Sequence, residues 1–500
     1  MKPIGDVEKT RREYHGDAQK NTVHRSSLMA PRLPGTDVDI SFVNHFLLKR
    51  GHENVACRLT AVDPEGQRVE SRTFQVCEPR VYAFELSSLT NAPVANYIVE
   101  FFSPSNLFIP FPAVVVNHRN ARFLNSVHSY NRVLNDVFED DAINSTRVRE
   151  ASVDVRVDEA TDTFALFTAG PTPCRGAIEV IVKSPGGILE AKVPVDLPRF
   201  SNQMVSLRSL FGKSLDGAVL TMRQPSQFLF YGRMLAGLRC EADGAIGANH
   251  SFYDCSEVEE YWDDGRPSSR VYPLLEGFRA RIRLYPIFSP CRLLSAVDFF
   301  DASGHLLKTV ECEPLCSPSE GHLDFTVRDA MTQEGVEGAT SFQYRAWPDG
   351  GKTPRRINHQ IVYEDEEGRS PLAASAAISL KNPSAFAPGG KKGLTWGQCA
   401  IGADLDSRLG IVLDHANGRT ERVTLRLIGE SGEAFRKEVD LPAGSAYVID
   451  PAELVPELTS PSGERPHYLW YWATCERPDL SAYTVTRHRQ SGHCTGDHSF

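Results

Sequence analysis

A short motif, a histidine followed by a serine and an aromatic residue, occurs three times along the chain and supplies groups that could bind a metal ion. The copies are His128-Ser129-Tyr130, His250-Ser251-Phe252 and His498-Ser499-Phe500. Ten residues before each of these histidines stands another imidazole or a thiol, namely His118, Cys240 and His488. Imidazole nitrogen and thiolate sulfur are ligands that zinc, iron and copper accept in proteins. The sequence therefore predicts three pairs of ligands.

Each pair offers two ligands, so a competent site requires a carboxylate or a third histidine. The densest group of ligating residues lies near the end of the sequence and comprises His488, His493, Cys494, Asp497 and His498. The other candidate binding residues flank the motifs, and they are Ser129, Tyr130, Ser251, Phe252, Asp254 and Asp497. The cofactor expected at such a site is a transition metal such as zinc, iron or copper.

A structural explanation of the same motif stands beside the metal hypothesis. The aromatic ring can pack in a core, the serine hydroxyl can cap a turn, and the imidazole can bond a backbone carbonyl. Repeats preserve packing features first, so shared ancestry alone accounts for the common spacing. The acidic residues after the first two motifs, 136–141 and 254–264, fit a solvated linker or a hard-cation site, but the spacing of a calcium loop is missing.

The motifs belong to a longer plan that the chain repeats four times. Each copy has two apolar strands joined by a turn with glycine, at Gly66, Gly187, Gly304 and Gly432. A strand rich in aromatic and β-branched residues follows, starting at Tyr97, Val219, Phe342 and Tyr468. Such residues favour strands, and glycine supplies the positive φ angle of a tight hairpin. The third copy keeps His359 but lacks the His-Ser-aromatic ending.

Short strands with frequent turn signals indicate an all-β chain of β-sandwich repeats with immunoglobulin-like or fibronectin-like topology. The expected organisation is a polar N-terminal arm (1–34) and four sandwich repeats (35–145, 146–270, 271–388 and 389–500). The alternative is two larger sandwiches, each built from two copies.

Composition narrows the function. The net charge is −10, so the chain has no overall basic footprint, and a nucleic-acid partner is not expected. No signal peptide and no long apolar run is visible, so we expect no membrane span and a cytoplasmic location with reduced thiols. Phosphate-binding loops, the G-x-S-x-G elbow and H-E-x-x-H are absent from the sequence, and no catalytic residue is assigned.

Three functions remain. The preferred hypothesis is a non-enzymatic binding or structural assembly protein, with a protein partner or self-association, because β edges and flat faces associate readily. The alternative is a metal-binding protein or metalloenzyme that uses the repeated histidines. A carbohydrate-binding role rests only on the fold class and the tryptophans, for example Trp470 and Trp472 in YLWYWA.

Overall fold

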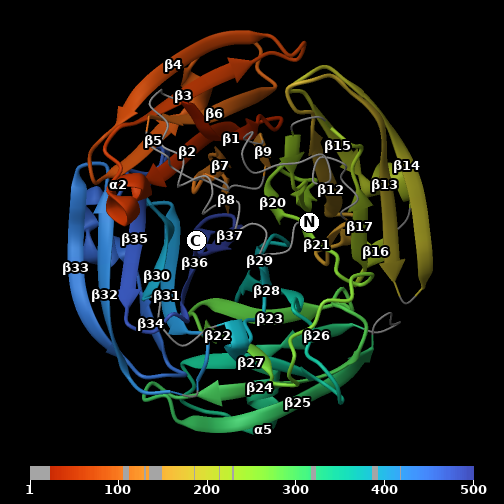
Figure 1. The fold of residues 1–500 in the computed structure, drawn as a ribbon, viewed down its shortest axis with the longest axis vertical. Helices are drawn as coiled ribbons and strands as arrows, with labels where there is room; N and C mark the ends of the chain where they lie inside the picture. The colour runs from red at the N-terminus through yellow and green to blue at the C-terminus, as the bar shows by residue number, and fades with distance from the viewer. Residues whose placement is uncertain are drawn as a thin grey trace.

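The computed structural model describes residues 23–104, 112–128, 131–133, 149–184, 186–212, 214–227, 230–316, 322–385, 392–416 and 418–500. The chain is nearly all β, and its antiparallel strands form pairs of sheets, as the sequence predicts. Within the described ranges four such pairs follow one another, and we call them sandwich 1 to sandwich 4 in chain order. Figure 1 shows them arranged around a centre, each with one sheet outside and one sheet inside.

Sandwich 1 contains the first outer sheet and the first inner sheet. The outer sheet has the order β18-β9-β1-β6-β3-β4, with β18 (Phe230–Gly232), β9 (Asn131–Val133), β1 (Val23–Pro31), β6 (Asn96–Ser103), β3 (Val55–Val62) and β4 (Arg68–Val76). The inner sheet has the order β5-β2-β7-β8, with β5 (Val81–Glu85), β2 (Asp37–Val43), β7 (Val115–Asn120) and β8 (Phe123–His128). Two short helical segments accompany them, α2 (His45–Arg50) and η1 (Leu86–Ser88).

Sandwich 2 repeats this arrangement. Its outer sheet consists of β14 (Gly187–Leu197), β13 (Cys174–Ser184), β17 (Val219–Arg223), β10 (Glu150–Ser152) and β21 (Phe252–Tyr253). Its inner sheet consists of β15 (Asn202–Ser206), β12 (Thr161–Thr168), β19 (Leu235–Cys240) and β20 (Ile246–His250). The smaller elements are β11 (Arg156–Val157), β16 (Leu215–Asp216) and α4 (Leu207–Phe211).

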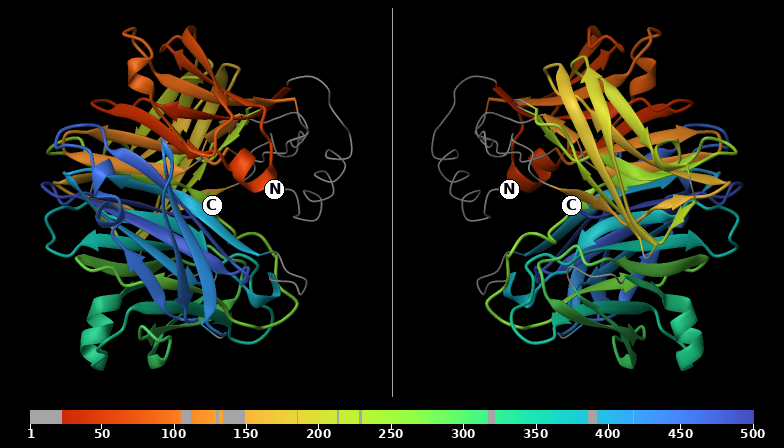
Figure 2. Two further views of the ribbon diagram at one scale, coloured as in Figure 1. Left: turned by 90° about the vertical axis from the view of Figure 1, so that its left-hand side faces the viewer. Right: turned by 90° about the vertical axis from the view of Figure 1, so that its right-hand side faces the viewer.

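Sandwich 3 has four strands in each sheet. The outer sheet consists of β22 (Ser268–Pro273), β27 (Ser341–Pro348), β24 (Arg292–Phe300) and β25 (Leu306–Cys316). The inner sheet consists of β26 (Leu323–Thr326), β23 (Phe278–Leu284), β28 (Asn358–Asp365) and β29 (Ala374–Ser379). Its helical segments are α5 (Val327–Glu334), which lies at the lower end of the molecule in Figures 1 and 2, and η2 (Pro383–Ala385).

Sandwich 4 also has four strands in each sheet. The outer sheet consists of β30 (Gly393–Ile401), β35 (His467–Cys475), β32 (Glu421–Gly429) and β33 (Gly432–Leu441). The inner sheet consists of β34 (Ala446–Ile449), β31 (Leu405–Leu413), β36 (Leu480–His488) and β37 (Cys494–His498). Its helical segments are α6 (Pro451–Leu454) and η3 (Pro456–Leu458).

The hairpins predicted from the four glycines are present on the outer sheets as β3–β4, β13–β14, β24–β25 and β32–β33. All four glycines have positive φ, which a residue with a side chain adopts only at a cost. Two of the tips also contact the next sandwich. A Cβ atom on Gly66 would overlap the backbone of Arg199, and one on Gly304 would overlap the backbone of Ala443.

Four strands, one from each inner sheet, meet at the centre of the molecule. β37 contacts β8, β8 contacts β20, β20 contacts β29, and β29 contacts β37. These edges do not join into one sheet, because side chains of one strand occupy the hydrogen-bonding groups of the next. Asn125 of β8 accepts a hydrogen bond from the backbone N–H of Ala248 (2.8 Å), and Asn249 of β20 donates to the carbonyl of Ser375 (2.8 Å). Side chains thus form hydrogen bonds with backbone groups of edge strands that could otherwise pair with another strand.

Sandwich 4 also packs against sandwich 1, so the chain closes on itself. The indole N–H of Trp470 donates to Ser41 (2.7 Å), and the Tyr468 hydroxyl donates to Asp39 (2.7 Å). Trp470 and Trp472 are buried in one apolar cluster with residues of sandwich 1, whereas Leu469 and Tyr471 lie in the core of sandwich 4. Both faces of YLWYWA are therefore buried, and this run of aromatic residues no longer supports a carbohydrate site.

Two predicted segments differ from the strand bounds. The polar arm was expected to extend to residue 34, but Val23–Pro31 forms β1, which pairs with β6 because its Leu28, Met29 and Ala30 are buried. The boundary at 270/271 cuts through β22. The breaks at 145/146 and 388/389 lie outside the described residues, and the division into four repeats stays a prediction. No helix in the described part of the chain is long and apolar enough to cross a membrane.

Candidate metal centre

The three motif histidines, far apart in the sequence, lie together at the centre of the molecule. His128 ends β8, His250 ends β20 and His498 ends β37. Their nearest ring nitrogens all lie within 4.8 Å of one another. The Nε2 atoms of His128 and His250 are 3.1 Å apart, close to the separation of about 3.0 to 3.4 Å that two nitrogens have when each lies 2.0 to 2.1 Å from one ion.

Sheet geometry explains why the three side chains converge. His128 lies opposite Val115, His250 opposite Leu235 and His498 opposite Tyr483 in their hairpins. Opposed residues share one face of a sheet. For His250 and His498 this face is turned toward the neighbouring sandwich, because Leu235 packs with sandwich 1 and Tyr483 with sandwich 3. On the face of His128, Ser126 accepts from Gln398 of sandwich 4 (3.4 Å). The inner sheets meet around one axis, so the three outward faces present their last side chains to a common point.

The Nδ1 atom of His250 is fixed by the backbone. It lies 2.8 Å from the carbonyl oxygen of Ser251, and a carbonyl oxygen can only accept, so Nδ1 carries the proton. The Ser251 hydroxyl in turn donates to the carboxylate of Glu150 (2.6 Å). Glu150 is fully buried and also accepts from the backbone N–H of Met234 (2.8 Å) and from Gln224 (2.6 Å). This set of bonds holds the peptide that orients His250.

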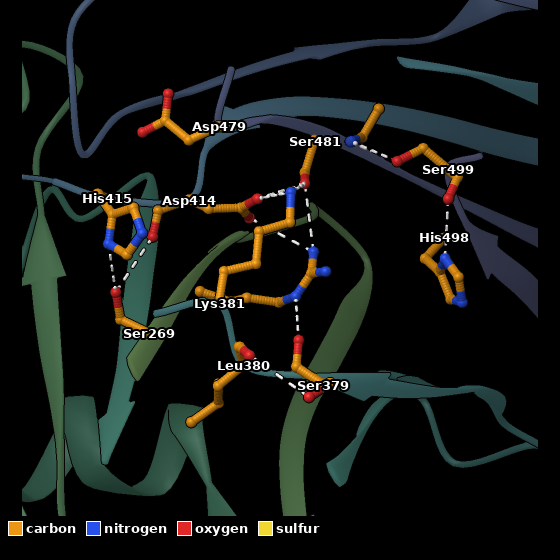
Figure 3. A network of polar contacts seen from close by, with 12 residues as sticks. Ser269, Ser379, Leu380, Lys381, Asp414, His415, Asp479, Ser481, His498 and Ser499 are labelled. Carbon is orange, nitrogen blue, oxygen red and sulfur yellow. Dashed lines mark hydrogen bonds and ion pairs between the residues drawn. The ribbon is translucent and has the colours of Figure 1, made fainter. Parts of the chain in front are cut away.

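His498 repeats the arrangement seen at His250. Its Nδ1 donates to the carbonyl oxygen of Ser499 (2.9 Å), and the Ser499 hydroxyl accepts from the backbone N–H of Ala482 (3.4 Å), as Figure 3 shows. The serine of the motif thus places the peptide whose carbonyl binds the preceding imidazole. His498 is half-buried, whereas His128 and His250 are buried, so the centre is nearest to solvent on the His498 side.

His128 is held by a carboxylate. Its Nδ1 donates to both oxygens of Asp497 (2.8 and 2.9 Å), and its backbone N–H donates to the same carboxylate (2.9 Å). Asp497 also accepts from the backbone N–H of His498 (2.8 Å). Burial alone would raise the pKa of Asp497, but the charge and hydrogen bond of His128 outweigh burial and hold that pKa below its ordinary value. Asp497 therefore lies at the position that a carboxylate partner of a metal-binding histidine usually takes, with both oxygens bonded to Nδ1 of His128.

These hydrogen bonds direct the Nε2 atoms of the three rings toward one another. Nδ1 carries a proton on every ring, so Nε2 is the atom of each ring that is left to bind. The 3.1 Å contact between His128 and His250 is then repulsive unless a cation or a proton lies between the two atoms. Burial lowers the pKa of His250 well below its ordinary value and lowers the pKa of His498 to about 3, with the nearby His128 acting in the same direction. Burial therefore opposes a second proton on the ring of His250 or His498.

The predicted partners ten residues upstream do not reach this centre. The two strands of each hairpin pair in a continuous register, so the residue opposite each motif histidine is fixed. In each case this opposite residue lies an odd number of positions along its strand from the predicted ligand, which is His118, Cys240 or His488. Residues an odd number apart point to opposite faces of a strand, so each predicted pair is divided between the two faces of its sheet. The predicted two-residue ligand pairs are therefore wrong as geometry, although one member of each pair is in the centre.

The equal spacing itself is partly a coincidence. In the first motif the turn between β7 and β8 has two residues, because Asn120 pairs with Phe123. In the second and third motifs four residues connect the strands, from Cys240 to Ala245 and from His488 to His493. His118 is therefore not the structural counterpart of Cys240 or His488. Its Nε2 instead donates to the carbonyl oxygen of Pro31 (2.9 Å), and burial lowers its pKa to about 4.

The remaining predicted residues have structural contacts. Cys240 is buried, which raises its pKa, and His488 contacts Ser491 across its turn. Asp254 caps a turn by accepting from the backbone N–H and the hydroxyl of Ser256. Phe252 is buried beside Ala151. Ser129 and Tyr130, and the first acidic segment, lie outside the described residues.

Sequence reasoning missed Glu150 and Phe500. Glu150 stands alone in its segment, and nothing in the spacing links it to Ser251. Phe500 lies beside His128, with ring centroids 5.2 Å apart, and stacks on Trp470 and Trp396, so it forms an apolar wall next to the histidines. Its position as the aromatic residue of the third motif was the available signal.

Comparison with known proteins assigns no family. No family model matches the chain, and no curated protein matches it. Among solved structures, Bacteroides uniformis beta-glucuronidase 2, covalently bound to cyclophellitol-6-carboxylate aziridine, aligns over 95% of both chains at 6% sequence identity. The TM-score of that alignment is 0.13, which is too low to support an argument about fold or function.

Proposed function

We propose that this chain is a metal-binding protein that holds one divalent transition-metal ion on the Nε2 atoms of His128, His250 and His498. The observation that carries the proposal is the convergence of three imidazoles whose Nδ1 atoms are all committed to an oxygen acceptor. Metal-binding histidines almost always donate their other N–H to a carboxylate or a backbone carbonyl, and both kinds of acceptor occur here.

Three neutral imidazoles suit zinc, iron, copper or nickel better than calcium or magnesium, which prefer oxygen ligands. The three ligands come from sandwich 1, sandwich 2 and sandwich 4. A bound ion would therefore join strands that do not share a sheet, and its binding free energy would add to the stability of the assembled molecule. This role is compatible with a structural or assembly protein. In it the three histidines are ligands rather than packing residues.

The test is elemental analysis of the full chain expressed without a polyhistidine tag and purified without a nickel column. We expect about one equivalent of a first-row transition metal per chain, or stoichiometric uptake of Zn²⁺ or Co²⁺ after treatment with a chelator. Uptake below about a tenth of an equivalent would overturn the proposal. It would favour a metal-free state in which the Nε2 atoms of His128 and His250 share one hydrogen bond.

A matched pair of variants separates the centre from other histidines. His250→Ala removes a proposed ligand, whereas His118→Gln changes a buried histidine outside the centre. The metal content of the first variant should fall to background, and that of the second should equal the content of the unaltered protein.

A further inference from the structure

The central ring of strands has four members but only three histidines, and Ala377 of β29 occupies the fourth place. Three of the inner sheets show the equivalence directly. In each of them a row of paired residues runs across three strands and ends at the centre, and its first member stands five residues after the start of the first strand. The rows are Leu166–Leu235–His250, Gly410–Tyr483–His498 and Arg283–Gln360–Ala377.

The contacts between neighbouring strands are compatible with this alignment. At the edge of β8, the residue two before His128 donates its N–H to Thr495, and at the edge of β20 the residue two before His250 donates to Asn125. At the edge of β29, Asn249 donates to the carbonyl of Ser375, which is two residues before Ala377. The receiving strand uses the position two before His128, His250 or Ala377 in all three contacts, whereas the neighbouring strand contributes the residue three before its histidine in the first two contacts and one before it in the third.

Ala377 points to the correct side of its sheet. Ala374, Ala376 and Ile378 belong to the core of sandwich 3, so the alternation of a strand turns Ala377 to the opposite face. There it is buried in a cluster with Ala151 and with Phe252, two residues after His250. An alanine side chain has no ligating atom, so the fourth strand brings a methyl group to the place where the others bring imidazoles.

We infer that the metal centre, which has three protein ligands among the described residues, keeps one exchangeable coordination position on the side of Ala377, which takes water and small anions. The inference rests on the proposed metal site and goes beyond it by naming what the ion binds next. Structural zinc sites fill four positions with protein ligands, whereas sites that exchange water or substrate keep three. His498 is the least buried of the three histidines, so solvent is nearest to the ion on its side.

The probe is Co²⁺, whose visible spectrum reports its ligands, with azide as the small anion. The unaltered full chain is loaded with Co²⁺ and titrated with azide. We expect the visible bands to shift in a saturable way as azide replaces water. Failure to bind Co²⁺ would overturn the proposed function itself, whereas a stoichiometric Co²⁺ complex that ignores azide would overturn only the exchangeable position.

Two variants at the fourth place sharpen the test. Ala377→His supplies a fourth imidazole, and it should bind Co²⁺ roughly tenfold tighter or more and lose the azide response. Ala377→Leu is a control of similar bulk without a donor atom, and it should show no tightening. Equal tightening in both variants would contradict the inference, because bulk rather than coordination would then explain it. The azide titration of the unaltered chain decides the question even if neither variant folds.

Discussion

The three-histidine centre and the Asp414 cluster are both buried groups of polar side chains where sandwiches meet, but they differ in how their charges are balanced. Asp414 accepts ion pairs from Lys381 and Arg270 and a hydrogen bond from Ser481 (2.6 Å). Figure 3 shows this cluster beside His498 and Ser499. Burial would raise the pKa of Asp414, but the charges of Lys381 and Arg270 outweigh burial and lower it. Every charge in that cluster has a partner within the chain.

The histidine centre differs, because in the described part of the chain its Nε2 atoms face one another rather than a group of opposite charge. Its N–H groups are all satisfied, while its three Nε2 atoms meet one another. Buried polar groups in native proteins are almost always paired. The contact between the Nε2 atoms of His128 and His250 requires one proton or one cation between them, and the proposed metal ion would meet that requirement. Burial of polar residues does not by itself identify a ligand site, whereas a group of acceptor atoms that face one another favours such a site.

The largest expected effect is on folding, at the balanced cluster. Asp414→Ala removes a fully buried carboxylate from the half-buried Lys381 and Arg270, and removing one partner of a buried pair costs about 3 to 5 kcal/mol. Urea unfolding at saturating Zn²⁺ should show this loss, while metal content stays unchanged. Asp440→Ala, at the exposed pair with Arg422, is the control and should cost less than about 1 kcal/mol. Equal costs for the two variants would remove the distinction between the clusters.

The next effect is on metal affinity, at the unbalanced centre. His250→Ala removes one of three ligands and should weaken Zn²⁺ binding by about 10³-fold, which corresponds to about 4 kcal/mol. Competition with a chromogenic chelator measures it, and His118→Gln serves as the control. The centre would lose its special status if both variants bound Zn²⁺ equally.

A smaller loss is expected at the residue that orients His128. Asp497→Asn keeps the size of the side chain but removes the carboxylate that accepts from Nδ1, and such a change typically weakens metal binding by about 10- to 100-fold. The same chelator competition measures the loss, with Asp254→Asn as the matched control because Asp254 caps a turn outside the centre. Unchanged affinity in Asp497→Asn would show that the carboxylate has a purely structural role.

The sequence predicted the all-β class, the four hairpins with positive φ at Gly66 and its counterparts, and the three histidines that converge. These depend on local patterns: strand periodicity, turn chemistry and a repeated motif. The grouping of the histidines across repeats was not predictable, because it depends on how separate sheets pack around an axis. The pairing within repeats was wrong because a spacing counted along the chain ignores turn length and the face of the strand.

Ala377 shows the same limit from the other side. The third copy lacks the motif in sequence, and its equivalent position became visible only through the register of β28 with β29 and the bond from Asn249 to Ser375. An alanine among alanines carries no sequence signal. Its importance depends on the three histidines around the same axis. The missing histidine of the third copy is therefore informative only once the arrangement of the four central strands is known.

The smallest expected effect tests whether His118 belongs with packing residues rather than ligands. Burial lowers its pKa from 6.5 to about 4, so the unfolded chain binds its proton more readily than the folded protein does. Stability from this residue is therefore present above pH 6.5 and is lost as the pH falls toward 4, by about 2 kcal/mol between pH 7 and pH 5. In metal-free protein, urea unfolding at both pH values should show a shallower pH dependence for His118→Gln. The same slope in both proteins would mean that His118 is not held neutral by the fold.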